Sequence, residues 1–345
     1  EIDLTTGIPS PDITGKSRPD PVGSSPDMGA YENEFDYSGQ IDDVNINGAL
    51  HPKNLIWSYE NAGDGMATSG SGDLYCVNKS GDLICLNTGT GELNWTYDYE
   101  SDINGEYSPV VDSSGNIYTY SGSWLLSVDS SGQLNWKVEV DGGIREKISI
   151  DHDGNILVPN SNGVSNLNSS DGAQRWKFQA TYEDNNIEGS AGPITVGKLG
   201  NVVFTLNYEG TLTYSLTSEG SSLWRVKSDS VNFRECAVDS DGNVIVCYRD
   251  GAIVKLDQND GEVLWSSDSG NGTESPYNSM GAFVSSPVIG EDNQVLVGSY
   301  ANKIHSFQQH GTKNWRYSVQ IGAEVPGVID QNGNVYIGAN DYYLY

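Results

Sequence analysis

A repeated tryptophan constrains the fold of this chain more than any other feature. It recurs at intervals of 38 to 50 residues, at Trp57, Trp95, Trp136, Trp176, Trp224, Trp265 and Trp315. Residues 233–267 show the unit in full, with apolar segments at 236–238, 244–248 and 253–256 and a fourth around Trp265. Short apolar segments separated by Asp, Asn and Gly predict four antiparallel strands joined by tight turns. Four strands repeated with this period are typical of a β-propeller blade.

The turn between the first two strands of each unit gives the number of blades. It occurs seven times, at residues 70–73, 112–116, 151–155, 197–201, 239–243, 290–294 and 330–334. Gly or Asn recurs where the backbone must adopt a positive φ, and the leading Asp can accept a hydrogen bond from the backbone two residues later. We therefore predict an all-β domain at residues 51–345, a seven-bladed propeller of four-stranded antiparallel blades.

The two ends of the repeat indicate how the ring closes. The seventh unit reaches only its third strand, at residues 343–345, and lacks a tryptophan strand. Residues 54–59, upstream of the first unit, form a tryptophan strand that has no blade of its own. Pairing of residues 54–59 with 342–345 would complete the seventh blade and leave neither strand without a partner. We expect the ring to close in this way.

Residues 1–50 do not share the repeat and read as an extended leader rich in Pro, Gly, Ser and Asp. Within it, Asp-Ile-Thr-Gly-Lys-Ser-Arg-Pro at 12–19 and Ser-Pro-Asp-Met-Gly-Ala-Tyr-Glu at 25–32 resemble the closing segment of secreted right-handed parallel β-helix proteins. The resemblance covers about 25 residues, and the alternative is a proline-rich linker. Together with a start at Glu1 rather than Met, it implies a piece of a larger secreted protein.

Composition limits the classes of partner and the cellular locations that suit this chain. With 18 basic and 47 acidic residues the formal charge is -29, which argues against nucleic acid as a partner. The sequence has neither the long apolar run that membrane insertion needs nor the pattern of a signal peptide. An acidic chain with 41 glycines suits an extracellular or cell-surface protein, although acidity alone does not place it there.

The ends of the units carry a resemblance to a known family. Leu-Asn-Thr-Gly-Thr-Gly-Glu-Leu-Asn-Trp at 86–95 and Leu-Asp-Gln-Asn-Asp-Gly-Glu-Val-Leu-Trp at 256–265 resemble the pyrroloquinoline-quinone-type propeller repeat, and the likeness extends over residues 54–345. That family includes quinone-dependent dehydrogenases, an outer-membrane assembly lipoprotein and secreted surface proteins. The enzymes are eight-bladed and hold the quinone over a disulfide between adjacent cysteines. No two cysteines are adjacent here, which argues against this cofactor.

The aromatic residues have two interpretations. Because the seven tryptophans recur at one position of the unit, we expect them to pack between neighbouring blades rather than to bind a ligand. Trp124 falls outside the repeat and is the better candidate for a binding surface, although a single aromatic residue is more often packed.

The four cysteines form two candidate disulfides. If 80–81 is a two-residue hairpin turn, Cys76 stands opposite Cys85, close enough for a bridge. The same count about 241–242 places Cys236 opposite Cys247. Two such bridges would suit an oxidising compartment, and the alternative is four half-buried free thiols.

Two of the turns resemble the opening of a calcium loop. Asp151 and Asp153 precede Asn155, and Asp239 and Asp241 precede Asn243, so that oxygen ligands stand at alternate positions. The bidentate Glu that completes such a loop is absent because the chain passes directly into a strand. The pattern therefore favours ordinary turns over a bound calcium ion.

The candidate binding surface lies on the loops that run from a fourth strand to the next first strand. These loops cross one face of a propeller, and such loops usually carry function. They contain Arg145 and Glu146, Arg234 and Glu235, and, in the longest loop, Glu274 and Tyr277. Structural ion pairs in solvated loops are an equal alternative.

No catalytic motif stands out, so three classes of function remain open. The first is a non-enzymatic extracellular propeller that serves as a binding or scaffold module for a protein or glycan ligand. The second is a glycan-acting enzyme or carbohydrate-binding module, in which loss of Glu146 or Glu274 would abolish turnover. The third is a structural subunit whose leader docks on other copies of the chain and builds a filament or array.

Overall fold

The computed structural model describes residues 57–69, 72–99, 108–182, 185–186, 189–232, 234–269, 282–290, 292–319, 327–329 and 334–338, and the short paired strands β1 (Ile2–Asp3) and β2 (Ile8–Pro9). All of the regular secondary structure in these ranges is β-strand. Within the same ranges no helix is long and apolar enough to cross a membrane.

The strands form consecutive four-stranded antiparallel sheets, which we call blades 1 to 6, with the strands of each in chain order. Blade 1 consists of β3 (Ala62–Thr68), β4 (Asp73–Asn78), β5 (Leu83–Asn87) and β6 (Leu93–Tyr97). Blade 2 consists of β7 (Val110–Val111), β8 (Ile117–Ser121), β9 (Trp124–Val128) and β10 (Leu134–Glu139). Blade 3 consists of β11 (Ser149–Ile150), β12 (Ile156–Asn160), β13 (Gly163–Leu167) and β14 (Gln174–Gln179).

A short hairpin, β15 (Thr181–Tyr182) and β16 (Asn185–Asn186), precedes the second half of the ring. Blade 4 consists of β17 (Ala191–Val196), β18 (Val202–Asn207), β19 (Thr211–Leu216) and β20 (Ser222–Ser228). Blade 5 consists of β21 (Ala237–Val238), β22 (Val244–Cys247), β23 (Ala252–Leu256) and β24 (Val263–Asp268). Blade 6 consists of β25 (Val288–Ile289), β26 (Val295–Ser299), β27 (Lys303–Phe307) and β28 (Lys313–Ser318).

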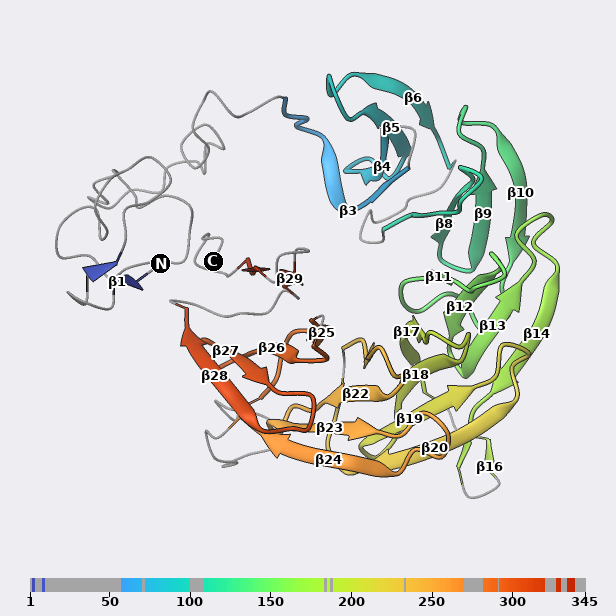
Figure 1. The fold of residues 1–345 in the computed structure, drawn as a ribbon. Coiled ribbons are helices and arrows are strands. Elements are labelled where there is room, and N and C mark those ends of the chain that lie inside the picture. The colour runs from blue at the N-terminus through green and yellow to red at the C-terminus, as the bar shows by residue number, and fades with distance from the viewer. Residues whose placement is uncertain are drawn as a thin grey trace.

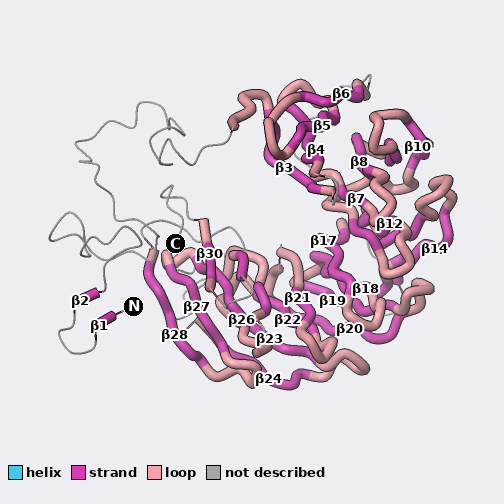
Figure 2. The backbone as a smooth tube through the Cα atoms, turned by 45° about the horizontal axis from the view of Figure 1, so that its top comes forward, coloured by secondary structure: helices cyan, strands magenta, loops and turns pink. Residues whose placement is uncertain are grey.

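A seventh sheet is described in part, as the pair β29 (Val328–Ile329) and β30 (Val335–Tyr336). The blades follow one another around a common centre, with the first strand of each innermost and the fourth at the outer edge (Figure 1). The tilted view gives the same arrangement (Figure 2). β29 contacts β25 of blade 6. The prediction of an all-β chain of four-stranded blades is confirmed. The closing segment at 342–345 lies outside the described residues, and so does the leader apart from β1 and β2.

The first turn of each complete blade has the backbone that the sequence predicts. A residue one or two positions before the second strand has a positive φ, with values of +90° at Gly72, +86° at Gly115, +84° at Gly154, +83° at Gly200, +92° at Gly242 and +54° at Asn293. The leading Asp caps the turn where it is present, because Asp112 Oδ1 accepts hydrogen bonds from the backbone N–H groups of Ser114 (2.8 Å) and Asn116 (2.9 Å). Glycine adopts this conformation without steric strain, which explains its recurrence.

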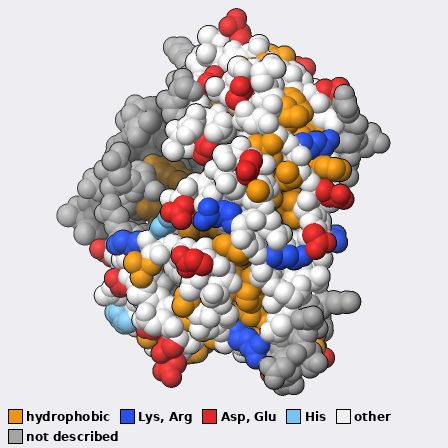
Figure 3. All heavy atoms as spheres, turned by 90° about the vertical axis from the view of Figure 1, so that its right-hand side faces the viewer, with side chains coloured by type: hydrophobic (Ala, Val, Ile, Leu, Met, Phe, Trp, Pro, Cys, Tyr) orange, Lys and Arg blue, Asp and Glu red, His pale blue; other side chains and the backbone are white. Residues whose placement is uncertain are grey.

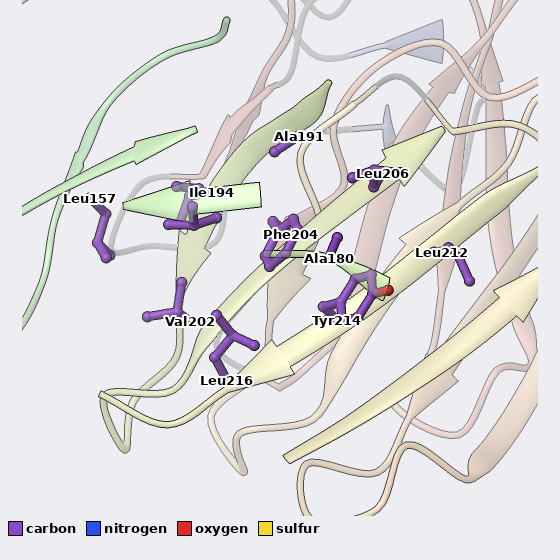
Figure 4. Close-up of a cluster of buried hydrophobic side chains, with 11 residues drawn as sticks. Leu157, Ala180, Ala191, Ile194, Val202, Phe204, Leu206, Leu212, Tyr214 and Leu216 are labelled. Carbon is purple, nitrogen blue, oxygen red and sulfur yellow. The ribbon is translucent and has the colours of Figure 1, made fainter. Parts of the chain in front are cut away.

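The hydrophobic core lies between neighbouring blades rather than at one centre. The largest cluster joins Leu157 of blade 3 to Ile194, Phe204, Tyr214 and Leu216 of blade 4, and all five are at most 5% exposed. Figure 4 shows these side chains filling the space between the two sheets. Phe204 and Tyr214 stack with ring centroids 5.2 Å apart. Each blade is therefore stabilised by the next, as expected of a repeat protein.

The repeated tryptophans join each blade to the next, as predicted. Each indole lies on a turn glycine of the following blade, so close that an added Cβ on that glycine would meet the ring at 2.5 to 2.8 Å. The pairs are Trp95 on Gly132, Trp136 on Gly172, Trp176 on Gly220, Trp224 on Gly261 and Trp265 on Gly311. Each Nε1–H also donates to a backbone carbonyl of the same turn, at 2.8 to 3.0 Å.

Trp57, at the start of the described propeller, makes the same contact with blade 1. Its indole covers Gly91, and its Nε1 donates to the carbonyl oxygen of Thr88 at 2.7 Å. Trp57 thus occupies the place that the outer strand of a preceding blade would give it. At the other end, Trp315 of blade 6 is 38% exposed and has no such partner among the described residues.

The prediction of two disulfides is wrong, because both turns are one residue longer than the count assumed. Tyr75 pairs with Cys85 and Cys76 with Ile84, which places the two cysteines on opposite faces of the sheet. The turn has three residues, since the N–H of Asn78 bonds the carbonyl of Asp82 and Gly81 has a φ of +93°. A one-residue change of register reverses the face of every side chain.

The second cysteine pair fails for the same reason. Ala237 pairs with Ile245, so that Cys236 stands opposite Val246 rather than Cys247. Cys236 packs in the cluster between blades 4 and 5, and Cys247 packs in the cluster between blades 5 and 6. All four cysteines are buried free thiols.

Candidate functional site

One face of the propeller, which we call the loop face, carries both the loops between blades and the turns between second and third strands. Backbone hydrogen bonds tie the described parts of these loops to neighbouring turns. The loop after β10 bonds blade 2 through Val140 N–H to Ser123 O (2.7 Å) and blade 3 through Arg145 N–H to Pro159 O (3.1 Å). The loop after β20 receives a bond from Arg249 N–H to Val231 O (3.0 Å). The face is therefore a fixed platform, built from backbone groups of adjacent blades.

Three of the predicted site residues, Glu146, Arg234 and Glu235, lie near enough on this face for their charges to interact. The pKa of Glu146 is raised, chiefly because the carboxyl is partly buried, and Glu235 raises it further while Lys147 and Arg234 lower it. Glu146 belongs to the loop that enters blade 3, whereas Arg234 and Glu235 belong to the loop that enters blade 5. Charges from loops of non-adjacent blades thus act on one another near the centre of the ring.

Arg145 and Trp124 lie apart from this group. The Arg145 side chain is exposed, and its backbone N–H is held by Pro159. Trp124 is 42% exposed at the start of β9, and the ammonium of Lys137 lies 5.1 Å from its ring centroid. A cation over an indole stabilises its position on the surface. Glu274 and Tyr277 lie outside the described residues.

A cavity of about 150 Å³ adjoins Arg234 on the loop face, between blades 5 and 6. Its lining consists of Asn232, Arg234, Cys247, Arg249, Phe283, Val284 and Tyr300. Of these residues the sequence singled out only Arg234 as a candidate for binding. The others come from the loops that enter blades 5 and 6, from the end of β22 and from the turns after β22 and β26. Only the folded ring brings them together.

A second hollow of about 360 Å³ lies on the same face between blades 2 and 3. It is lined by Ser123, Glu139, Val140, Asp141, Gly142 and Gly143. Ser123 Oγ donates to Glu139 Oε1 at 3.3 Å, and Lys177 Nζ lies 2.6 Å from Asp141 Oδ2. Both carboxylates thus have partners within the protein.

The four aspartates weighed as calcium ligands lie in turns, and the leading one of each pair caps its turn. Asp151 Oδ1 accepts from the N–H groups of Asp153 (2.9 Å) and Asn155 (2.8 Å). Asp239 makes the equivalent bonds, and its Oδ2 lies 2.5 Å from the buried ammonium of Lys255. Across the described ranges, no group of three or more His, Cys, Asp or Glu side chains is placed to hold a metal ion.

Comparison with known proteins gives the family. The family described as outer membrane protein assembly factor BamB matches residues 104–234 and 233–345. The chain belongs to this family. No match was found among curated protein sequences.

Solved structures similar to this BamB-family chain share its fold at low sequence identity. BamB from Moraxella catarrhalis is 18% identical with a TM-score of 0.62, covering 81% of this chain and 80% of that one. The WD40 β-propeller domain of Doa1 is 13% identical with a TM-score of 0.55, covering 84% and 93%. Quinohemoprotein alcohol dehydrogenase from Comamonas testosteroni is 11% identical with a TM-score of 0.54, covering 83% and 72%.

The dehydrogenase raises the question of a quinone, which the cysteines of this chain do not fit. The resemblance to the quinone enzymes implies a disulfide between adjacent cysteines beneath the cofactor. Here Cys76 and Cys85 lie in blade 1, Cys236 and Cys247 lie in blade 5, and all four are buried within or between the sheets. The thiols therefore supply no platform of that kind.

Proposed function

We propose that this BamB-family propeller is a non-enzymatic binding or scaffold module that holds a partner protein on its loop face. The observation that carries the proposal is the convergence of Glu146, Arg234 and Glu235 from the loops of two non-adjacent blades. Charged groups that meet on a fixed surface favour one orientation of a partner over others. The solved structure of BamB has the same fold and is named for an assembly factor.

The outer edge of the ring is a less suitable binding surface. Exposed leucines recur on the outer strands, at Leu93, Leu134, Leu223 and Leu264. On the side of the molecule in Figure 3, hydrophobic side chains reach the surface between charged ones. Exposed apolar residues are common on protein surfaces, and here they follow the repeat.

The experiment compares two variants that remove the same charge from opposite faces. The full chain is immobilised, and proteins captured from the medium around its source cells are quantified by mass spectrometry. The variant Glu146→Gln/Glu235→Gln neutralises the loop face. The control Glu92→Gln/Glu262→Gln neutralises exposed residues of the third turns, which lie on the other face.

We expect at least one protein whose capture falls about tenfold with the loop-face variant and is unchanged with the control, a difference of about 1.4 kcal/mol. Equal capture by both variants and the parent protein would show that the loop face does not bind. Turnover of any polysaccharide by the parent protein, lost in Glu146→Gln, would instead favour the glycan-acting enzyme.

The proposal includes a setting and a closed ring. The setting is extracellular or at the cell surface, as part of a larger secreted protein, on the strength of the acidic composition and the resemblance of residues 12–32 to a β-helix ending. Closure of seven blades through residues 54–59 is supported by Trp57, which docks on blade 1 as the other indoles dock on theirs. A closed ring leaves no outer strand missing from the seventh blade.

A further inference from the structure

The cavity between blades 5 and 6 holds a buried donor without an acceptor. Asn232 is 1% exposed, and its Nδ2 makes no hydrogen bond within the part of the chain that the structure describes. The rest of the residue is engaged, because its Oδ1 accepts from Arg234 N–H at 2.5 Å and its backbone N–H donates to Thr211 Oγ1 at 2.7 Å. These two bonds fix the side chain at the wall of the cavity. A buried donor is normally paired, so an acceptor is missing here.

The same cavity gathers positive charge in a strongly acidic protein. Arg234 and Arg249 both line it, and no lining residue is acidic, although the chain has 47 acidic and 18 basic residues. The Arg234 side chain makes no hydrogen bond or ion pair within the described ranges. Because Arg249 has a partner of its own, the groups that remain are the Arg234 guanidinium and the Asn232 amide N–H, which present donors only.

None of the described residues around the cavity supplies an acceptor to Asn232 Nδ2. Asp250, next to Arg249, accepts hydrogen bonds from Ser230 Oγ and from the N–H of Ala252 (2.9 Å). Burial raises the pKa of the Cys247 thiol well above its ordinary value, so that this wall of the cavity stays neutral at physiological pH. The lining itself thus contributes no carboxylate, and the charge of Arg234 acts on Glu146, which lies outside the lining.

The remaining walls are apolar and fixed by the backbone. Phe283 is 2% exposed, and its N–H donates to Tyr248 O at 3.3 Å. Tyr300 is 47% exposed, and its N–H donates to Ala282 O at 3.0 Å. A ligand here would place an anionic group among the donors and an apolar group against Phe283 and Tyr300.

We propose that this cavity binds a carboxylate of the partner protein, either a C-terminal carboxylate or an Asp or Glu side chain next to an apolar residue. A carboxylate has only acceptors, and it matches the planar fork of an arginine. A cavity of about 150 Å³ has room for one such group but not for a folded element. The inference rests on the proposed binding function and names the group that the loop face recognises.

The test uses three acetylated tetrapeptides, titrated into the full chain and followed by NMR of the arginine Nε–Hε signals. The first is Gly-Gly-Gly-Phe with a free carboxylate, the second is its C-terminal amide, and the third is the amide of Gly-Gly-Glu-Phe. The first and third separate the two sources of a carboxylate, and the second carries none. The variant Arg234→Gln identifies the signal of Arg234.

We expect at least one carboxylate peptide to bind about tenfold more tightly than the neutral amide, and Arg234→Gln to remove most of that difference. Binding should weaken when salt is raised from about 50 to about 500 mM, because part of the attraction is between charges. The matched control is Arg175→Gln, which removes an exposed arginine from the outer strand of blade 3 and should bind like the parent protein.

Equal binding of the neutral amide would overturn the proposal, as would equal weakening by Arg175→Gln and Arg234→Gln. These outcomes are distinct from failure of the proposed function. Peptide binding without capture of any protein would leave a site for small carboxylates, whereas capture without peptide binding would leave a binding module that recognises something else.

Discussion

At the scale of single residues, blade 5 differs from its neighbours at the position opposite the tryptophan. Lys255 pairs with Trp265 there, whereas the other complete blades have Cys85, Ser127, Asn166, Ser215 and Ser306. The Lys255 ammonium lies 2.5 Å from Asp239 Oδ2, with the two side chains 8% and 1% exposed. A buried pair of this kind contributes little by itself, but loss of one partner leaves an uncompensated charge.

We therefore expect Lys255→Met to lower the free energy of unfolding by about 3 to 5 kcal/mol, measured by urea denaturation. The double variant Lys255→Met/Asp239→Asn should recover much of the loss, because the Asn side chain still caps the turn and carries no charge. A single variant as stable as the parent protein would contradict the buried pair.

The buried His305 should make the free energy of unfolding depend on pH. Its pKa is lowered from 6.5 to about 4, chiefly by burial and in addition by the positive charges of Arg316, Lys303 and Lys313. Its Nε2 lies 3.0 Å from Ser299 Oγ, and Phe283 packs edge-on against the ring. Because the unfolded chain binds a proton that the folded chain does not, stability is lost as the pH falls from about 6.5 toward 4.

The full loss amounts to roughly 3 to 4 kcal/mol, since one pKa unit corresponds to about 1.4 kcal/mol. The measurement is the difference in unfolding free energy between the parent protein and His305→Gln at several pH values. Carboxylates titrate equally in both proteins, so the difference isolates His305. A difference that does not change with pH would disprove the shift.

The residues of the candidate site were only partly predictable from the sequence. Arg234 and Glu146 stood out because they lie in loops that the repeat places on one face. Asn232, Arg249 and Tyr300 did not stand out, because nothing local distinguishes them from ordinary loop and turn residues. A cavity between two blades depends on how the blades are placed relative to each other, and local sequence patterns do not predict that placement.

At the scale of the structural elements, the turn glycines have two different roles that mutation can separate. Gly220 has a φ of +81°, and a Cβ there would meet the Trp176 ring at 2.5 Å. Gly154 has a nearly identical φ of +84° but has nothing within 4 Å of such a Cβ. Substitution at both sites strains the backbone, but only Gly220 also supports an indole.

We expect Gly154→Ala to cost about 1 to 2 kcal/mol, the strain of the left-handed conformation. Gly220→Ala should cost about 1 to 3 kcal/mol more, because the indole of Trp176 must move from its place between the blades. Urea midpoints of the two variants give the comparison. Equal midpoints would show that the indole contact adds nothing to stability.

The strands themselves were predictable, but their register was not. Residues 244–248 and 253–256 were expected as strands, and the structure has β22 and β23 at Val244–Cys247 and Ala252–Leu256. Hydrophobic alternation and turn residues fix the existence of a strand. The pairing of Cys236 with Cys247 failed because Gly and Asp suit both two- and three-residue turns, and one residue decides which side chains face each other.

At the scale of the whole molecule, the ring depends on contacts that pass from each blade to the next. Five indoles of blades 1 to 5 dock on the following blade, and loops on one face bond the turns on either side. In such an arrangement the two ends are the weakest place unless they meet. Trp57 is docked on blade 1, which points to a segment that ties the N-terminal side of the propeller to the ring.

The variants Trp57→Ala and Trp315→Ala test closure with the same chemical change. Trp57 covers Gly91 and bonds Thr88, so its loss should lower the thermal midpoint by several degrees, equivalent to about 2 kcal/mol. Trp315 is 38% exposed, and in the described ranges its indole covers no turn glycine. Its loss should therefore have less than about half that effect. Deleting residues 1–60 should reproduce or exceed the effect of Trp57→Ala, because it removes the whole closing strand. If the deletion leaves the melting curve unchanged, residues 54–59 do not close the ring.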